Sequence, residues 1–285
     1  MLAGHPQISP CVVKEPGFLY PKGFPTRGLQ LIAFEEGLPR YLGLFGTRPG
    51  LRMEATANYL YAPGVPERIN DLFPGARVIL ILRNPVDRLI SEFGFAKLMR
   101  AFPHEMTFSE YLAVQRAQDH DDTWREPHLR ALSNGLYSRH LERFLATLGR
   151  QRVHVTWTDE LNRDPGGTLR GICSFLGIPS DRFDTVRPVV SNRARRISRP
   201  WLHGLGFQLS AWRAGRIVSH RRDWATRAAG RAVGFLMRAS TTNADPVALA
   251  TDERRLLEAF YHEEPRRLRE MLGQPVPWNR GGPQP

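Results

Sequence analysis

The sequence predicts an α/β fold in which a central parallel sheet is flanked by helices. Runs of strand length alternate along the chain with longer segments of helical periodicity. The run Arg77–Leu82 (RVILIL) is continuously apolar and rich in β-branched residues, which is typical of a strand buried on both faces of a parallel sheet. Arg152–Trp157 (RVHVTW) alternates between apolar and polar residues, as a second strand would. Because helices separate the strands, right-handed crossovers should connect them.

The other elements follow the same alternation of strand and helix. We expect further strands at Cys11–Lys14 and Leu51–Glu54, and helices at Leu38–Phe45, Val65–Leu72, Val86–Met99, Gly135–Leu148, Pro165–Leu176 and Ala248–Leu272. Pro85 precedes the third of these helices, where its fixed backbone angle favours a first helical turn. The fourth helix is amphipathic, because its apolar side chains recur every three or four residues. A helical stripe also runs through Leu202–Trp212.

Composition places the chain among globular proteins. Its 285 residues are 41% hydrophobic and 24% charged, which excludes disordered and collagen-like classes. No apolar run approaches the roughly 18 residues of a membrane span. The start at Met1 lacks the basic and apolar stretches of a secretory signal. The two cysteines, Cys11 and Cys173, make no disulfide framework, so a cytoplasmic location is expected.

The chain is strongly basic, and arginine supplies almost all of the excess charge. Lys plus Arg number 40 against 28 for Asp plus Glu, which gives a net charge of +12. Eleven arginines and one acid lie between Arg193 and Arg238. Arginine stays charged and can bind an oxyanion through two parallel hydrogen bonds, so the expected partners carry phosphate or sulfate, or are nucleic acids or acidic membrane surfaces.

The stretch 201–238 combines these arginines with Trp201, Trp212 and Trp224 in an amphipathic pattern. Basic helices of this kind lie on anionic membranes, bind nucleic acid, or pack on their own domain and cover its cleft. The sequence favours packing on the domain. It leaves a weak membrane-surface contact open, and among the anionic partners nucleic acid is not the one expected.

The segment Arg77–Phe93 (RVILILRNPVDRLISEF) carries the most chemical information. Arg83 stands at the carboxyl end of the predicted strand, and ligands of open α/β sheets bind beyond such ends. The helix that follows Asn84-Pro85 should present free backbone N–H groups and a positive dipole to an anion. Arg83 adds a guanidinium, and Ser91 adds a hydroxyl about two turns along the helix. The alternative is an arginine that caps a strand and a serine that bonds its own helix.

This segment resembles the 3′-phosphate-binding segment of sulfotransferases that use 3′-phosphoadenosine 5′-phosphosulfate (PAPS). In that family an arginine and a serine bind the 3′-phosphate, and Arg83 and Ser91 are the corresponding residues. Further matches follow one another in the order found in the glycan-modifying branch of this family, which includes the heparan sulfate enzymes. The resemblance is to the bacterial type of that branch. These matches are Glu54–Leu60 (EATANYL), Val65–Ile69 (VPERI), Tyr137 with Leu141, Asp159–Leu161 (DEL) with Asp164-Pro165, Phe175–Pro179 (FLGIP), and Phe260–Leu272 with Trp278.

The resemblance implies a P-loop kinase-like sulfotransferase fold. Residues 1–279 would form one domain with a basic helical insertion at 201–245, followed by a flexible tail at 280–285. The activity implied is transfer of a sulfuryl group from PAPS, as co-substrate, to a hydroxyl or amine of a glycan or small-molecule acceptor. The resemblance implies no metal.

The resemblance also assigns a role to each matching residue. Glu15, in the KEPGF segment, would be the general base that takes the acceptor proton, with Lys14 beside it. The residues that would contact the nucleotide are Arg83, Ser91, Tyr137, Arg193, Arg195 and Arg196. The last three belong to a basic loop that would close over the phosphates.

Two features depart from the pattern of the family. Upstream of the part that matches His5–Ile8, the family has a first strand and a K-x-G-T-T loop that binds the 5′-phosphosulfate, and no such sequence follows any lysine here. We therefore expect the first strand and its loop to be missing, which leaves an open edge on the sheet. Either the start codon was assigned too late or the chain is a truncated relative. Ala55 stands where some glycan enzymes place a lysine, which argues against a heparan-like acceptor.

Two other functions remain open from the sequence. One is an N-terminally truncated, catalytically inactive relative that still binds the nucleotide. The other is a basic protein that binds anions or membrane surfaces through Arg193–Arg238. The sequence identifies neither the acceptor nor the oligomeric state.

Overall fold

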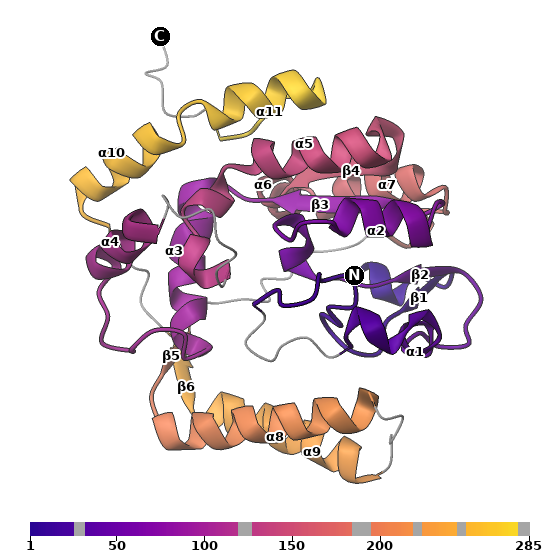
Figure 1. Ribbon diagram of the computed structural model, residues 1–285, viewed down its shortest axis with the longest axis horizontal. Coiled ribbons are helices and arrows are strands. Elements are labelled where there is room, and N and C mark those ends of the chain that lie inside the picture. The colour runs from indigo at the N-terminus through magenta and orange to yellow at the C-terminus, as the bar shows by residue number, and fades with distance from the viewer. Residues whose placement is uncertain (26–31, 119–126, 184–194, 219–223, 244–248, 279–285) are drawn as a thin grey trace.

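The computed structural model describes residues 1–25, 32–118, 127–183, 195–218, 224–243 and 249–278. Short strands and longer helices alternate through most of this part of the chain (Figure 1). The α/β class expected from the sequence is confirmed. The tail expected at 280–285 lies outside the described residues.

Six strands within the described residues form three separate pairs. In chain order they are β1 (Ile8–Pro10), β2 (Leu51–Met53), β3 (Val78–Leu82), β4 (Val153–Trp157), β5 (Arg195–Ile197) and β6 (Thr241–Asn243). β1 pairs with β2 and β3 pairs with β4, both in parallel, while β5 and β6 are antiparallel. The parallel strands expected from the sequence are present, but as two pairs and not as one continuous ladder.

The first strand lies three residues earlier than the sequence predicts. Ile8–Pro10 pairs with β2, and the strand expected at Cys11–Lys14 is not formed. Cys11 instead bridges to Phe45, so the chain leaves β2 at this point. Val13 is still buried, because a loop can carry an apolar side chain into the core as well as a strand can.

Most helices begin and end where local signals indicate. Those of the described residues are α1 (Leu38–Leu42), α2 (Val65–Leu72), α3 (Pro85–Leu98), α4 (Phe108–Gln118), α5 (Tyr137–Leu148), α6 (Thr158–Arg163), α7 (Pro165–Leu176), α8 (Pro200–Val218), α9 (Trp224–Ala239), α10 (Thr251–Phe260) and α11 (Glu264–Leu272). The side chain of Asp164 caps the start of α7 by accepting from the Gly167 N–H. The helix ends at Gly177, whose backbone is left-handed.

The closing helix expected at Ala248–Leu272 is in fact two helices, α10 and α11. The first ends at Phe260, and Pro265 stands in the first turn of the second. Inside one continuous helix this proline would lack a hydrogen-bond donor, and its ring would clash with the carbonyl of Tyr261. The helix therefore stops and restarts.

The main core lies between the β3–β4 pair and helices α2, α5 and α11 (Figure 1). Trp157, Leu141, Phe144 and Leu268 are fully buried within it. A second apolar cluster packs α3 against α4 and α10. The two clusters hold the end of β3 and the start of α3 between them.

β3 is less buried than the sequence predicts. It pairs with β4 along one edge, and within the described part of the chain no strand pairs with its other edge. Leu82 at the end of the strand is buried, but Ile81 is 47% exposed. The expectation that this apolar run is buried on both faces is therefore wrong for Ile81.

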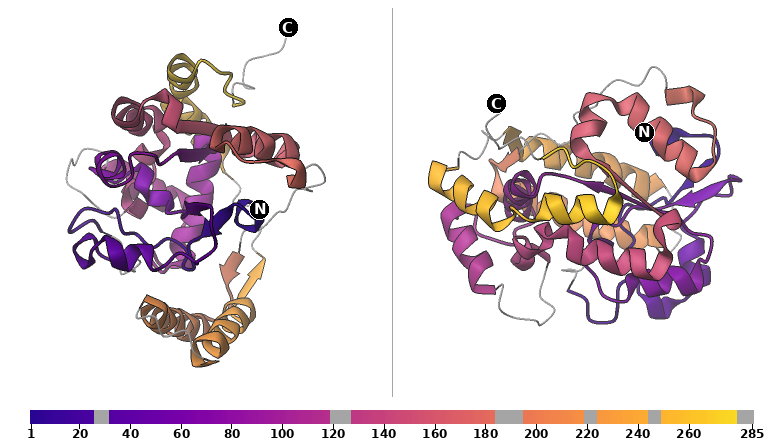
Figure 2. Two further views of the ribbon diagram at one scale, coloured as in Figure 1. Left: turned by 90° about the vertical axis from the view of Figure 1, so that its right-hand side faces the viewer. Right: turned by 90° about the horizontal axis from the view of Figure 1, so that it is seen from above.

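α8 and α9 form a helical hairpin that stands apart from the rest of the molecule (Figures 1 and 2). A Cβ on Gly206 would lie 3.1 Å from the Cβ of Leu236, and one on Gly230 would lie 2.9 Å from the Nε of Arg213. Contacts that run in opposite directions along the two helices show that they pack antiparallel. The expectation that this stretch covers a cleft of its own domain is wrong, because the two helices pack mainly on each other.

Candidate active site

Side chains from two other elements hold the carboxyl end of β3. The carbonyl of Leu82 accepts a hydrogen bond from the hydroxyl of Thr158 at 3.3 Å. The next carbonyl, that of Arg83, accepts one from the hydroxyl of Tyr137 at 2.9 Å. Tyr137 is buried at the start of α5, whereas Arg83 is exposed. The structure thus brings together two of the residues expected at the nucleotide, and Arg83 leaves the sheet at a fixed point.

The first turn of α3 has no backbone donor left for an anion, contrary to the expectation from the sequence. Pro85 has no N–H. The side-chain oxygen of Asn84 accepts from the N–H of Val86 at 3.0 Å and from that of Asp87 at 3.4 Å. The N–H of Arg88 donates to the Asn84 carbonyl at 2.8 Å. Because the asparagine cap takes up these donors, an anion at this place must be bound by side chains.

Arg83 and Ser91 are the exposed side chains of this strand–helix unit that match the expected phosphate site. Ser91 follows Asn84 by seven residues, which is close to two helical turns. Asn84 and Ser91 therefore lie on the same side of α3, and Arg83 directly precedes Asn84. A guanidinium and a hydroxyl placed in this way can bind the oxygens of a tetrahedral anion.

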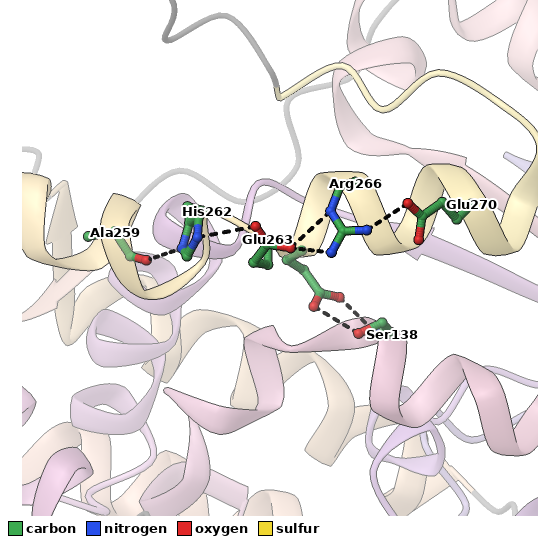
Figure 3. Close-up of polar contacts among 7 residues, drawn as sticks. Ser138, Ala259, His262, Glu263, Arg266 and Glu270 are labelled. Carbon is green, nitrogen blue, oxygen red and sulfur yellow. Dashed lines mark hydrogen bonds and ion pairs between the residues drawn. The ribbon is translucent and has the colours of Figure 1, made fainter.

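A buried carboxylate fixes the start of α5 and so the position of Tyr137. Glu264 is 1% exposed, and it accepts from the Ser138 N–H at 2.5 Å and from the Ser138 hydroxyl at 2.9 Å. Figure 3 shows Ser138 at the start of α5, facing the turn between α10 and α11. Burial raises the pKa of Glu264, and the hydrogen bonds from Ser138 act in the opposite direction.

Sequence reasoning missed Glu264, although a signal for it was available. Glu264, Leu268 and Leu272 are spaced four residues apart and are all buried, so they share one face of α11. A carboxylate on the same helix face as core leucines is itself expected to be buried, and a buried carboxylate needs a hydrogen-bond donor beside it.

Glu15 and Lys14, the expected catalytic pair, lie in the loop that follows β1. The Lys14 ammonium is 3.5 Å from the Glu15 carboxylate, and the lysine side chain is exposed. An exposed pair of this kind contributes little to stability. The backbone of Glu15 has a φ of 54°, in the left-handed region that residues with a side chain rarely adopt. This strained backbone, more than the ion pair, marks Glu15 as a functional candidate.

The structure brings Glu15 close to a second carboxylate, Glu54, which follows β2. Glu54 is half-buried and accepts hydrogen bonds from the Thr56 hydroxyl at 2.8 Å and the Tyr41 hydroxyl at 3.5 Å. Burial raises the pKa of Glu54 to about 7; the charge of Glu15 adds to this effect and the hydrogen bonds oppose it. Two neighbouring carboxylates that differ in burial are typical of acid–base sites.

The sequence places Glu54 within the EATANYL match but indicates no role for it. The short strands β1 and β2 are separated by 40 residues, and the local sequence pattern does not predict that they pair. Parallel pairing carries the loops after both strands to the same edge, and with them Glu15 and Glu54.

Tyr61, in the segment after β2, lies near Arg88 of α3 and against His140 of α5. Burial raises the pKa of Tyr61, and the nearby positive charge of Arg88 opposes this shift. Tyr61 also packs edge-on against His140 of α5, with ring centroids 5.1 Å apart. Desolvation, with the charge of Arg143 acting in the same direction, lowers the pKa of His140 to about 3. The segment after β2 therefore packs against α5 at an imidazole that is neutral near pH 7.

The expected basic loop is only partly within the described chain. Arg193 lies outside the described residues. The backbones of Arg195 and Arg196 form β5, opposite Asn243 and Thr242 of β6. The side chains of Arg195 and Arg196 lie outside the described part, so the role of all three arginines at the nucleotide stays a prediction.

Comparison with known protein families identifies the central part of the chain. The family model for the sulfotransferase domain matches residues 63–196. This segment contains Arg83, Ser91 and Tyr137 with the strand and helices that position them. Glu15 and Glu54 precede it.

Two curated relatives match about half of the chain. It is 25% identical over 150 residues to the bifunctional heparan sulfate N-deacetylase/N-sulfotransferase 1 of Caenorhabditis elegans, which covers 53% of this chain and 17% of the relative. It is 29% identical over 147 residues to the heparan sulfate glucosamine 3-O-sulfotransferase 6 of Mus musculus, which covers 51% of this chain and 41% of the relative. The match thus spans less than half the length of either relative.

A solved structure extends the similarity beyond the central segment. The crystal structure of a sulfotransferase from Alicyclobacillus acidocaldarius resembles this fold with a TM-score of 0.55 at 29% sequence identity. The similarity covers 79% of this chain and 91% of that one. The chain is therefore similar to sulfotransferases: the model of their domain matches residues 63–196, and a solved bacterial sulfotransferase resembles 79% of the chain.

Proposed function

We propose that this protein transfers a sulfuryl group from PAPS to a hydroxyl or amine of a glycan or small-molecule acceptor. The observation that carries the proposal is the end of β3, where Arg83 leaves the sheet on a backbone held by Tyr137. This arrangement lies within the segment that matches the sulfotransferase domain. Heparan sulfate sulfotransferases are among the relatives, which supports a glycan as the class of acceptor.

In this proposal Arg83 and Ser91 bind the 3′-phosphate of the nucleotide. The guanidinium supplies two parallel N–H donors and the serine hydroxyl supplies a third. The residues fit a phosphate, because both side chains are exposed on one strand–helix unit. Since the Asn84 cap occupies the backbone donors, the affinity should depend strongly on Arg83. Charge-assisted hydrogen bonds of this type contribute on the order of 1.5–3 kcal/mol.

The transfer step requires a base for the acceptor. The acceptor oxygen or nitrogen forms a bond to sulfur while the bond between sulfur and the phosphate oxygen of the nucleotide breaks, as in other in-line transfers. Glu15 takes the proton that the acceptor loses. Glu54, whose pKa is about 7, is a second proton acceptor beside it. The basic loop with Arg193, Arg195 and Arg196 adds positive charge for the phosphates.

Calorimetric titration with 3′-phosphoadenosine 5′-phosphate, the nucleotide product, tests the binding half of the proposal. The wild-type chain should bind it, and Arg83→Ala should bind it at least roughly ten-fold more weakly. Arg77→Ala is the matched control, because Arg77 stands just before the opposite end of β3 and its replacement removes the same charge. Absence of binding by the wild type, or an equal loss in both variants, would overturn the assignment.

Transfer of radiolabelled sulfate from PAPS to a panel of glycosaminoglycans and small hydroxyl or amine acceptors tests the chemical half. Glu15→Gln keeps the shape of the side chain and removes the base, so turnover should fall by about 10²–10⁴-fold while nucleotide affinity stays the same. Glu35→Gln, at an exposed position, should leave turnover unchanged. Wild-type turnover in Glu15→Gln would place the base elsewhere.

A further inference from the structure

The α8–α9 hairpin is firmly attached at its base and otherwise projects from the molecule (Figures 1 and 2). His203 is buried, with Nε2 at 2.9 Å from the carbonyl of Leu98 at the end of α3 and Nδ1 at 3.2 Å from the hydroxyl of Ser240. The carbonyl of Ser240 accepts from the N–H of Ser198 at 2.9 Å. The hairpin is thus anchored to the end of α3 through His203 and extends away from the main body.

The outer side of α8 is apolar. Trp201 is 72% exposed, and Leu205 and Trp212 are exposed as well. These residues are four and seven positions apart, which places them in one stripe along the helix. In a water-soluble helix the exposed stripe is normally polar. An exposed apolar stripe such as this one therefore indicates a surface that binds a partner.

The outer side of α9 combines aromatic and basic side chains. Trp224 is 75% exposed and Phe235 is 64% exposed. Arg231 and Arg238 are exposed at positions seven and fourteen after Trp224, so they share the face of the two aromatic residues. Arg227 is exposed one turn from Trp224.

The hairpin carries positive charge without any acidic residue in its described part. Residues 195–218 and 224–243 contain no aspartate or glutamate, and Asp223 is the one acid between 193 and 238. The guanidinium of Arg216 lies over the ring of Trp212 at 5.0 Å from its centroid. Arginine binds phosphate oxygens through its guanidinium while its alkyl part stays in contact with apolar groups.

We propose that the α8–α9 hairpin docks the protein on the surface of an anionic phospholipid bilayer. Trp201, Trp224 and Phe235 would enter the headgroup region, and the arginines of α9 would pair with lipid phosphates. No helix among the described residues is long and apolar enough to cross a membrane, so the hairpin would lie on the surface. A nucleic acid or a polyanionic glycan would use the arginines but would leave the stripe of Trp201, Leu205 and Trp212 in water, which favours the bilayer.

Co-sedimentation of the full chain with phospholipid vesicles tests this docking. The chain should bind vesicles of phosphatidylcholine with phosphatidylserine at least roughly ten-fold better than phosphatidylcholine alone, and high salt should weaken this binding. Binding should shift tryptophan fluorescence to shorter wavelengths, because three indoles lie on the hairpin. Absence of binding to the anionic vesicles would overturn the proposal.

Matched variants distinguish vesicle binding by the hairpin from nonspecific binding through other exposed apolar side chains. The combined Trp201→Ser, Trp224→Ser and Phe235→Ser variant should bind anionic vesicles roughly ten-fold more weakly, because binding scales with buried apolar area. The control combines Leu256→Ser and Phe260→Ser, which removes exposed apolar groups from α10, and should bind as the wild type does. Equal losses in both would overturn the proposal.

Two further measurements identify the partner and test whether the variants remain folded. Melting temperatures of the variants should match that of the wild type, because the replaced side chains are exposed. If the aromatic variant melts early, Arg227→Gln, Arg231→Gln and Arg238→Gln together provide the second test and should remove the preference for phosphatidylserine. Tighter binding to heparin or duplex DNA than to vesicles, unaffected by the aromatic replacements, would assign the hairpin to a polyanion and reject the bilayer.

Discussion

Glu54 and Glu264 are both carboxylates removed from water, and their hydrogen-bond partners give them different roles. Glu264 accepts from a backbone N–H and from a hydroxyl of Ser138, which ties two helices together. Glu54 accepts from the hydroxyls of Thr56 and Tyr41 and lies beside another carboxylate. A hydroxyl can accept as well as donate, so Glu54 can take up a proton and keep its partners.

We predict that Glu54 makes the protein less stable as the pH rises from about 4.5 to about 7. The pKa is raised in the folded state, so in this range the folded chain holds a proton that the unfolded chain has lost, and the free energy of unfolding falls with rising pH. The full effect is at most about 3 kcal/mol. Urea unfolding at a series of pH values measures it, and Glu54→Gln should remove this component. A pH profile that Glu54→Gln leaves unchanged would contradict the raised pKa.

At the scale of elements, the ends of helices position the site. α3 starts with the side chain of Asn84 as its cap, and α5 starts against Glu264 from a distant part of the chain. Both caps take up backbone donors that would otherwise be free. Arg83 lies between these two capped starts, so the charge for an anion comes from its side chain and not from the helix ends.

We predict that Glu264→Ala lowers the free energy of unfolding by about 1–3 kcal/mol, because the N–H of Ser138 is left buried without an acceptor. Glu263→Ala is the matched control: Glu263 is the preceding residue, is exposed, and pairs with Arg266 on the surface (Figure 3). Its loss should cost much less than that of Glu264, because a surface ion pair contributes little to stability. Chemical denaturation of both variants measures the difference. Similar losses of unfolding free energy in the two variants would contradict the role assigned to Glu264.

The whole molecule combines an open parallel sheet with a projecting hairpin. β3 keeps one edge without a strand partner in the described part of the chain, and the exposed Ile81 lies on this strand. Such edges favour association with other chains, because unpaired backbone groups and apolar side chains are presented together. We therefore expect the open edge of β3 to promote self-association of the chain.

We predict that Ile81→Thr reduces self-association of the chain and changes the free energy of unfolding by less than about 1 kcal/mol, because the side chain is 47% exposed. Leu82→Ala is the comparison, because Leu82 is the adjacent residue, is buried, and should cost about 2–5 kcal/mol. Sedimentation velocity measures association and urea unfolding measures stability. A cost for Ile81→Thr as large as that for Leu82→Ala would show that Ile81 is covered in solution.

The sequence by itself determined the elements whose signals are local. The bounds of α2 and α7 were predicted correctly; a proline in the first helical turn marks both starts, and Gly177 marks the end of α7. The unit of β3 and α3 followed from an apolar run before Asn84-Pro85, and with it came Arg83 and Ser91 as candidates.

Only the tertiary structure decided the relations between distant residues. These are the pairing of β3 with β4, the proximity of Glu15 to Glu54, the bonds from Ser138 to Glu264, and the exposure of the aromatic side chains on α8 and α9. The sequence favoured packing of this last stretch on the domain and expected free backbone N–H groups at the start of α3; both expectations were wrong. Periodicity indicates which side chains form a face, but not which partner covers it, and burial, pKa and hydrogen bonding all depend on that partner.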